Sequence, residues 1–168
     1  MAAASFGCVS SGMPASSGHP LDGRAAPRVS VRPPGQAEVG IPSGRAETAL
    51  TVVDFWASWC APCIRAMPEL ERLHRQYREA GVEVIGVDVD ERRSDGDAAA
   101  ARAGASFTIV HDPWGRVVRA YGLRSIPMTF VLDRRGVVRW SGNDLGALRG
   151  AIDALLEEAH ASAPVGRR

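Results

Sequence analysis

The 168-residue sequence predicts an α/β fold in which helices flank a central mixed β-sheet. β-Branched and aromatic residues form a short run at 51–56, and apolar residues recur at helical spacing from Ala61 onward. A second run, 84–89, is almost wholly apolar, as expected of a central strand covered on both faces. Two more strands and a helix follow near the C-terminus. This order of elements predicts one mixed sheet with helices on both faces.

The helix that follows the first strand has two distinct faces. Its apolar face consists of Met67, Leu70, Leu73 and Tyr77, which recur at helical spacing. The opposite face carries arginines and glutamates at spacings that favour ion pairs in solvent. We therefore expect this helix to pack one side on the sheet and to leave the other in water.

Thirty-seven residues, 90–126, separate the second strand from the next one. They predict, in order, an Ala-rich helix at about 95–103, a strand at 107–110, a turn at 112–113 and a short helix that ends near Tyr121. The segment thus predicts an insertion of helix and strand into the sheet.

The C-terminal part predicts a hairpin and a helix. Strands at 130–132 and 137–140 flank a turn, and Asn143 or Asp144 can cap the helix that follows. The apolar stripe of this helix consists of Leu145, Leu148, Ile152, Leu155 and Leu156.

Two cysteines, Cys60 and Cys63, lie where the first strand gives way to its helix. The positive end of the helix dipole and the unpaired N–H groups of the first turn favour a thiolate at Cys60. The thiolate is the form that attacks disulfides. Cys63 follows one helical turn later, close enough to form a disulfide with Cys60. The pair therefore predicts a redox-active dithiol.

A zinc site and an inert structural disulfide are the alternatives for this pair. Zinc needs more ligands at suitable spacing, but the remaining cysteine, Cys8, lies in a tail-like segment and the four histidines are scattered. An inert disulfide is disfavoured because the start of a helix makes a cysteine reactive. We therefore expect no bound metal and no cofactor.

The segment 54–63, Asp-Phe-Trp-Ala-Ser-Trp-Cys-Ala-Pro-Cys, resembles the active-site segment of thioredoxins. Pro68 matches the proline inside the active-site helix of that family, and 125–130 resembles its cis-proline loop. The resemblance covers about residues 46–159. It implies a thioredoxin fold in which Pro127 is the cis-proline that faces the cysteines.

The insertion before Pro127 is similar to that of the TlpA-like disulfide reductases, tethered thiol-disulfide oxidoreductases that include cytochrome c maturation factors. Residues 26–41 loosely resemble the short hairpin that precedes the core in that group. Peroxiredoxins share the insertion, but their peroxide-reducing cysteine lies outside a Cys-x-x-Cys pair. The resemblance therefore implies a TlpA-like thiol-disulfide oxidoreductase.

The resemblance assigns Cys60 as the attacking cysteine and Cys63 as the resolving one. TlpA-like proteins often carry a glutamate three residues after the second cysteine and an asparagine six residues before the first. This chain has Ala66 and Asp54 at those positions. Our hypothesis is that Asp54, buried and with a raised pKa, deprotonates Cys63. The alternative is a buried carboxyl that only forms structural hydrogen bonds.

The remaining site residues concern substrate contact. By resemblance, Pro127 would pack against the cysteine pair, and the backbone of Ile126 would pair with an extended segment of a protein disulfide substrate. Trp59 would lie exposed beside Cys60 as an apolar docking surface.

Three further residues bear on how the site is supported and on the direction of electron flow. Trp56 would support Asp54 and the helix. Ala61 and Pro62, between the cysteines, lack the histidine of strongly oxidising relatives, which favours a reductant. Such a reductant needs an upstream electron donor, either a thioredoxin-like protein or a membrane thiol relay protein.

The chain divides into three predicted parts. Residues 1–45 are rich in Ala, Ser, Gly and Pro and are expected to be flexible or partly ordered, 46–160 to form one thioredoxin-like domain, and 161–168 to be a disordered tail. No stretch is apolar and long enough to span a membrane.

The segment around Cys8 resembles the end of a bacterial lipoprotein signal, with a Ser/Gly-rich spacer behind it. A start codon upstream of Met1 would make Cys8 a lipidation site and a tether on the envelope side of the membrane. The alternative is an incidental cysteine in a cytoplasmic protein.

The net charge of +1, without a concentrated basic run, argues against nucleic acid as a partner, and we expect a monomer. Two other functions stay open beside the disulfide reductase. One is a thiol peroxidase, which would need a threonine or serine and an arginine around its cysteine. The other is a non-catalytic redoxin-fold module that binds a metal or a protein.

Overall fold

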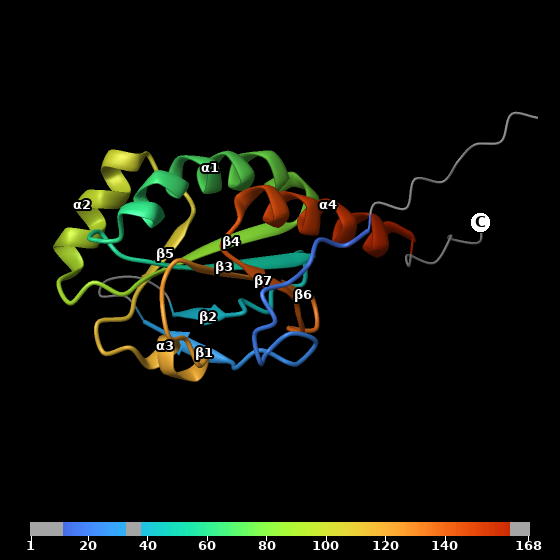
Figure 1. The fold of residues 1–168 in the computed structure, drawn as a ribbon, viewed down its shortest axis with the longest axis horizontal. Helices are drawn as coiled ribbons and strands as arrows, with labels where there is room; N and C mark the ends of the chain where they lie inside the picture. The colour runs from blue at the N-terminus through green and yellow to red at the C-terminus, as the bar shows by residue number, and fades with distance from the viewer. Residues whose placement is uncertain (1–11, 33–37, 162–168) are drawn as a thin grey trace, which may run out of the picture.

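The computed structural model describes residues 12–32 and 38–161, and a five-stranded sheet forms its centre (Figure 1). In chain order the strands are β3 (Leu50–Trp56), β4 (Val82–Asp88), β5 (Thr108–His111), β6 (Met128–Asp133) and β7 (Val138–Gly142). Their order in the sheet is β5-β4-β3-β6-β7. The first three run parallel, whereas β6 and β7 are antiparallel to their neighbours. The predicted mixed sheet is confirmed.

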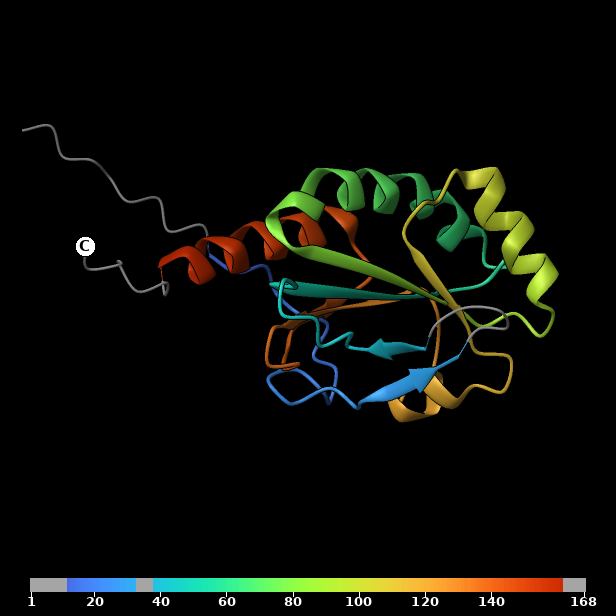
Figure 2. The same cartoon turned by 180° about the vertical axis from the view of Figure 1, so that it is seen from behind.

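Both faces of the sheet are covered (Figures 1 and 2). One face carries α1 (Ala61–Tyr77, continued by the 3-10 turn η1 at Arg78–Ala80), α2 (Arg93–Ala103) and α4 (Leu145–Ala161). The other carries α3 (Arg116–Ala120) and an antiparallel hairpin of β1 (Val29–Val31) and β2 (Val39–Ile41).

Strand β3 contributes to the apolar layers on both faces in strict alternation. Val52 and Trp56 pack in the layer beneath α1 and α4. Val53 and Phe55 pack in the layer that the hairpin and α3 cover. Because side chains alternate along a strand, Asp54 points toward α1, on the same side as Val52 and Trp56.

The predicted helical faces are confirmed. All four apolar residues expected on the inner face of α1 are buried, as are four of the five expected on α4, the fifth being half-buried. Of the two candidate caps, Asp144 acts: its Oδ1 accepts the N–H of Ala147 at 2.7 Å.

The insertion is present with small shifts at its element ends. Strand β5 begins at Thr108 rather than at Phe107. The side chain of Phe107 is buried in the apolar layer on the α1 side of the sheet. Strand β5 also ends one residue later than expected, at His111, which lies opposite Asp88 at the end of β4. Both residues therefore reach the edge of the sheet where the parallel strands end.

The described N-terminal residues pack against the rest of the fold. Ser16 and Ser17 contact the hydroxyl of Ser141 on β7, and Ile41 is fully buried. The hairpin implied by resemblance is present as β1 and β2. The candidate lipidation site Cys8 lies outside the described residues. Within 12–32 and 38–161, no helix has the length and apolar character needed to cross a membrane.

Candidate active site

Helix α1 begins at a disulfide. Cys60 is the N-cap residue, and its Sγ lies 2.01 Å from Sγ of Cys63. The backbone N–H of Cys63 donates a hydrogen bond to Cys60 Sγ at 3.3 Å. A thiolate at Cys60 would therefore meet this donor together with the positive end of the helix dipole. The structure thus places a backbone donor and a helix N-terminus at Cys60 Sγ.

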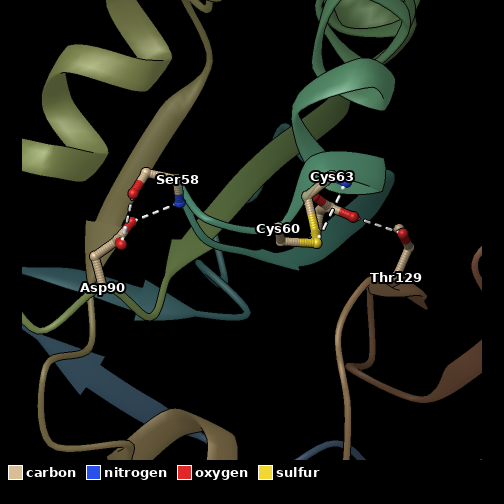
Figure 3. The surroundings of a disulfide bond; sticks show 6 residues. Ser58, Cys60, Cys63, Asp90 and Thr129 are labelled. Carbon is tan, nitrogen blue, oxygen red and sulfur yellow. Dashed lines mark hydrogen bonds between the residues drawn. A yellow bond between two sulfur atoms is a disulfide. The ribbon is translucent and has the colours of Figure 1, made fainter.

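Asp54 lies on the same side of β3 as the residues that pack with both cysteines. Its carboxyl is buried, and the hydroxyl of Thr129 on β6 donates to Oδ1 at 2.6 Å (Figure 3). Loss of solvent raises the pKa of Asp54 to about 6, although the bond from Thr129 offsets part of the rise. The carboxyl can therefore gain or lose a proton near neutral pH.

The loop before β6 holds the two residues predicted to meet the substrate. The Ile126–Pro127 peptide bond is cis, and both residues are half-buried. Met128 pairs with Phe55 in the β6–β3 ladder, so Pro127 lies at the end of β3 from which the chain enters the cysteine segment. Substrate contact at Ile126 stays a prediction.

The two tryptophans of the motif have opposite environments. Trp59 is 68% exposed, whereas Trp56 is fully buried in the apolar cluster that contains both cysteines. Ala61 and Pro62 are exposed in the first turn of α1. The exposed dipeptide and Trp59 thus form the outer surface around the disulfide.

Ser58 and Asp90 were not predicted as site residues from the sequence. Oδ2 of Asp90 accepts the backbone N–H of Ser58 at 2.7 Å, and Oδ1 accepts the Ser58 hydroxyl at 2.8 Å (Figure 3). The signal for this contact was present, because Asp90 follows a parallel strand and the carboxyl ends of parallel strands meet at one edge of the sheet.

A second group that was not predicted consists of Asp88 and His111, next to Asp90. The N–H of Asp90 donates to Oδ1 of Asp88 at 3.0 Å, and Nδ1 of His111 lies 2.9 Å from Asp88 Oδ2. Burial is the main cause that raises the pKa of Asp88 above its ordinary value. In the described part of the chain, no three His, Cys, Asp or Glu side chains gather as a metal site.

A model of the AhpC/TSA family matches residues 23–141. Two curated relatives are named thiol-disulfide oxidoreductase ResA. The one from Geobacillus thermodenitrificans is 39% identical and the one from Geobacillus kaustophilus 38% identical, each over 87 residues. Each match covers 52% of this chain and 50% of the relative, so the chain spans about half the length of the curated relatives it matches.

Solved structures share the fold. A Chlorobium tepidum protein described as a thiol:disulfide interchange protein DsbE is 31% identical, with a TM-score of 0.73; 80% of this chain and 97% of that one are covered. A thiol-disulfide oxidoreductase from Bacteroides fragilis is 24% identical, with a TM-score of 0.71 over 79% of this chain and 99% of that one. At that identity the second likeness speaks for the fold alone. The predicted thioredoxin fold is confirmed.

Proposed function

Because the chain belongs to the AhpC/TSA family, we propose that it is a thiol-disulfide oxidoreductase that reduces protein disulfides through Cys60 and Cys63. One observation carries this proposal: the two sulfurs form a disulfide at a helix start, where the Cys63 N–H faces Cys60 Sγ. The names of the ResA relatives support it.

The reaction proceeds in two exchanges. In the first, the Cys60 thiolate attacks one sulfur of the substrate disulfide, the substrate S–S bond breaks, and a mixed disulfide forms as the other substrate sulfur leaves as a thiolate. In the second, the Cys63 thiolate attacks Cys60 Sγ, which releases the second substrate thiolate and closes the Cys60–Cys63 disulfide. The substrate gains two electrons and the dithiol loses two.

Asp54 accepts the proton that Cys63 must lose before the second exchange. Cys63 is 2% exposed, and burial in apolar surroundings raises the pKa of a thiol. A neighbouring carboxyl with a pKa of about 6 is ionised at neutral pH and can take that proton. The alternation of β3, which turns Asp54 toward the layer that holds the cysteines, supports this role.

Substrate recognition uses the surface around the disulfide. An extended substrate segment would pair with the backbone at Ile126, beside Pro127, while Trp59 offers an apolar contact. The 68% exposure of Trp59 supports this use, because a large apolar side chain in water gains from being covered.

The protein acts as a reductant and as a monomer. Ala61 and Pro62 place no histidine between the cysteines to stabilise the thiolate of the reduced form. After each cycle the disulfide must be reduced again, so the activity requires an upstream thiol donor, either a thioredoxin-like protein or a membrane thiol relay protein.

Insulin reduction with dithiothreitol as the electron source tests the proposal. We expect wild-type protein to catalyse the reaction and Cys60→Ser to be inactive. Reduced Cys63→Ser, mixed with insulin after the dithiothreitol has been removed, should accumulate a mixed disulfide with substrate, visible on a non-reducing gel. A redox titration should give a potential nearer to that of thioredoxin, about −270 mV, than to that of a strong oxidant, about −120 mV.

Two results would overturn the proposal. Rapid consumption of hydrogen peroxide without insulin reduction would favour a thiol peroxidase. Tight metal binding by the reduced dithiol, again without insulin reduction, would favour a non-catalytic binding module.

A further inference from the structure

We propose that Asp90 is a positioning residue, which holds Ser58 and thereby places Cys60 for its attack on the substrate; this inference rests on the proposed function. The juxtaposition that carries it is a carboxylate, 3% exposed, that accepts both hydrogen-bond donors of one residue two positions before the attacking cysteine. Figure 3 shows Ser58 and Asp90 facing each other beside the disulfide.

The segment between β3 and α1 needs such a support. It spans 57–60 and belongs to neither a strand nor a helix. The N–H of Cys60 closes a turn on Ala57 O at 3.1 Å, and the side chain of Trp59 lies largely in water. Packing therefore does little to fix the middle of this turn. The two hydrogen bonds from Ser58 to one buried carboxyl hold the middle of the turn.

Asp90 is itself held from behind. Its N–H donates to Asp88 Oδ1, and Asp88 Oδ2 lies 2.9 Å from His111 Nδ1. Helix α2 closes over this group with Gly96, where an added Cβ would clash with the carboxyl of Asp88. The inserted elements α2 and β5 thus pack around the carboxylate pair that supports the turn of the active site.

A comparison of two substitutions separates position from charge. Asp90→Asn keeps the shape of the side chain: its amide oxygen can accept the Ser58 N–H while its amide nitrogen donates to the Ser58 hydroxyl, which then accepts. Asp90→Glu keeps the charge but moves both oxygens by one methylene. If position is what matters, Asn should recover the function and Glu should not.

The test measures the rate of Cys60 attack on a disulfide, with oxidised glutathione as the probe and each variant in a Cys63→Ser background. We expect Asp90→Ala and Asp90→Glu to slow the attack by about 10-fold or more, because small misplacement of a reacting group costs up to about 100-fold. Asp90→Asn should recover most of the wild-type rate. Glu91→Gln, which removes the charge of the exposed neighbour, is the matched control and should leave the rate unchanged.

A second readout distinguishes positioning from general support of the fold. The thiol pKa of Cys60, measured from alkylation rates against pH, should rise in Asp90→Ala because Cys60 Sγ is no longer held against the Cys63 N–H. In proteins that retain Cys63, the second exchange, in which Cys63 attacks Cys60 Sγ, should be slowed less than the first in the same variant, because both cysteines lie on one helical turn. A general loss of folding would slow both steps equally.

Three results would overturn the inference: a wild-type rate of attack in both Asp90→Ala and Asp90→Glu, equal slowing in Asp90→Asn and Asp90→Glu, or equal slowing of both exchanges. If Asp90→Ala does not fold, the Asn and Glu pair still decides between position and charge. Failure of the proposed function looks different, because wild-type protein itself would then reduce no disulfide.

Discussion

Two buried carboxylates lie near the dithiol, and they differ in the donors that reach them. Asp54 and Asp90 are almost equally buried, with 5% and 3% of their surface exposed. Asp54 accepts a bond from the hydroxyl of Thr129, whereas Asp90 accepts a backbone N–H and a hydroxyl from Ser58. Burial alone therefore does not decide what a carboxyl does; its donors do.

The difference matches two tasks. Loss of water raises the pKa of Asp54, and its single hydroxyl donor offsets only part of that rise, which suits proton exchange with a buried thiol. A carboxyl that binds a backbone N–H fixes the chain to which that N–H belongs. Thus one buried aspartate, Asp54, serves proton transfer, and the other, Asp90, serves positioning.

The largest effect is expected from a substitution at Asp54. We expect Asp54→Ala to slow the second exchange by about 100-fold at neutral pH, because general-base catalysis contributes about 10²-fold to 10⁴-fold. Asp90→Ala is the matched variant and should slow this step much less than Asp54→Ala does. Single-turnover release of a labelled peptide thiol from the mixed disulfide measures the rate, and a wild-type rate in Asp54→Ala would exclude the base role.

The stability of the folded state should depend on pH through Asp54. Its pKa is raised from 3.8 to about 6, so the protonated carboxyl favours folding below about pH 3.8, and this contribution is lost as pH rises through about 6. Asp54→Asn does not titrate. Relative to wild type it should therefore gain about 2 kcal/mol between about pH 4 and about pH 8.

Urea unfolding of wild type and Asp54→Asn across that range measures the difference. Parallel curves for the two proteins would show that the carboxyl does not change its proton affinity on folding.

Thr129→Val removes the hydroxyl that donates to Asp54 and so tests how that donor affects the carboxyl. The bond from Thr129 lowers the pKa of Asp54, so its loss should raise that pKa further. The pH midpoint of the second exchange should move upward, and the folded state should lose about 1 kcal/mol or somewhat more. Thr129→Ser, which keeps a hydroxyl, is the control; an unchanged midpoint in Thr129→Val would contradict the account.

Trp59→Ala should have the smallest effect on stability. Its side chain is 68% exposed, so the free energy of unfolding should change by about 0.5 kcal/mol or less. Both carboxylates keep their partners, and the second exchange should proceed at the wild-type rate. The KM for a protein substrate should rise, whereas that for a small disulfide should not; equal effects on both would contradict a docking role.

Much of the fold, and one of the two buried carboxylates, Asp54, could be predicted from the sequence. The strand at 51–56 is a short run of β-branched and aromatic residues, and the helix after it repeats apolar side chains at helical spacing, so Cys60 and Cys63 could be placed at the junction from the sequence. The role of Asp54 came from the resemblance. Resemblance supplied Pro127, whose cis bond composition alone does not indicate. The cis bond at Ile41–Pro42 lacked any such signal.

Asp90 was missed although its place directly after a parallel strand was a signal. The expected strand at 84–89 ran one residue past the end of β4 at Asp88, so Asp88 was assigned to the interior of the strand rather than to its end. The bond between Asp90 and Ser58 also joins residues 32 positions apart, one of them in a turn, where no periodicity sets the direction of a side chain.

The alternation of β3 has a consequence for how this protein tolerates change in length. Insertion or deletion of one residue before Asp54 within β3 would shift the register and turn Asp54 toward the hairpin side of the sheet, away from the cysteines. The same change in the exposed turn at 134–135 leaves that register intact. Length variation among natural relatives should therefore be tolerated in the turn and absent from the strand.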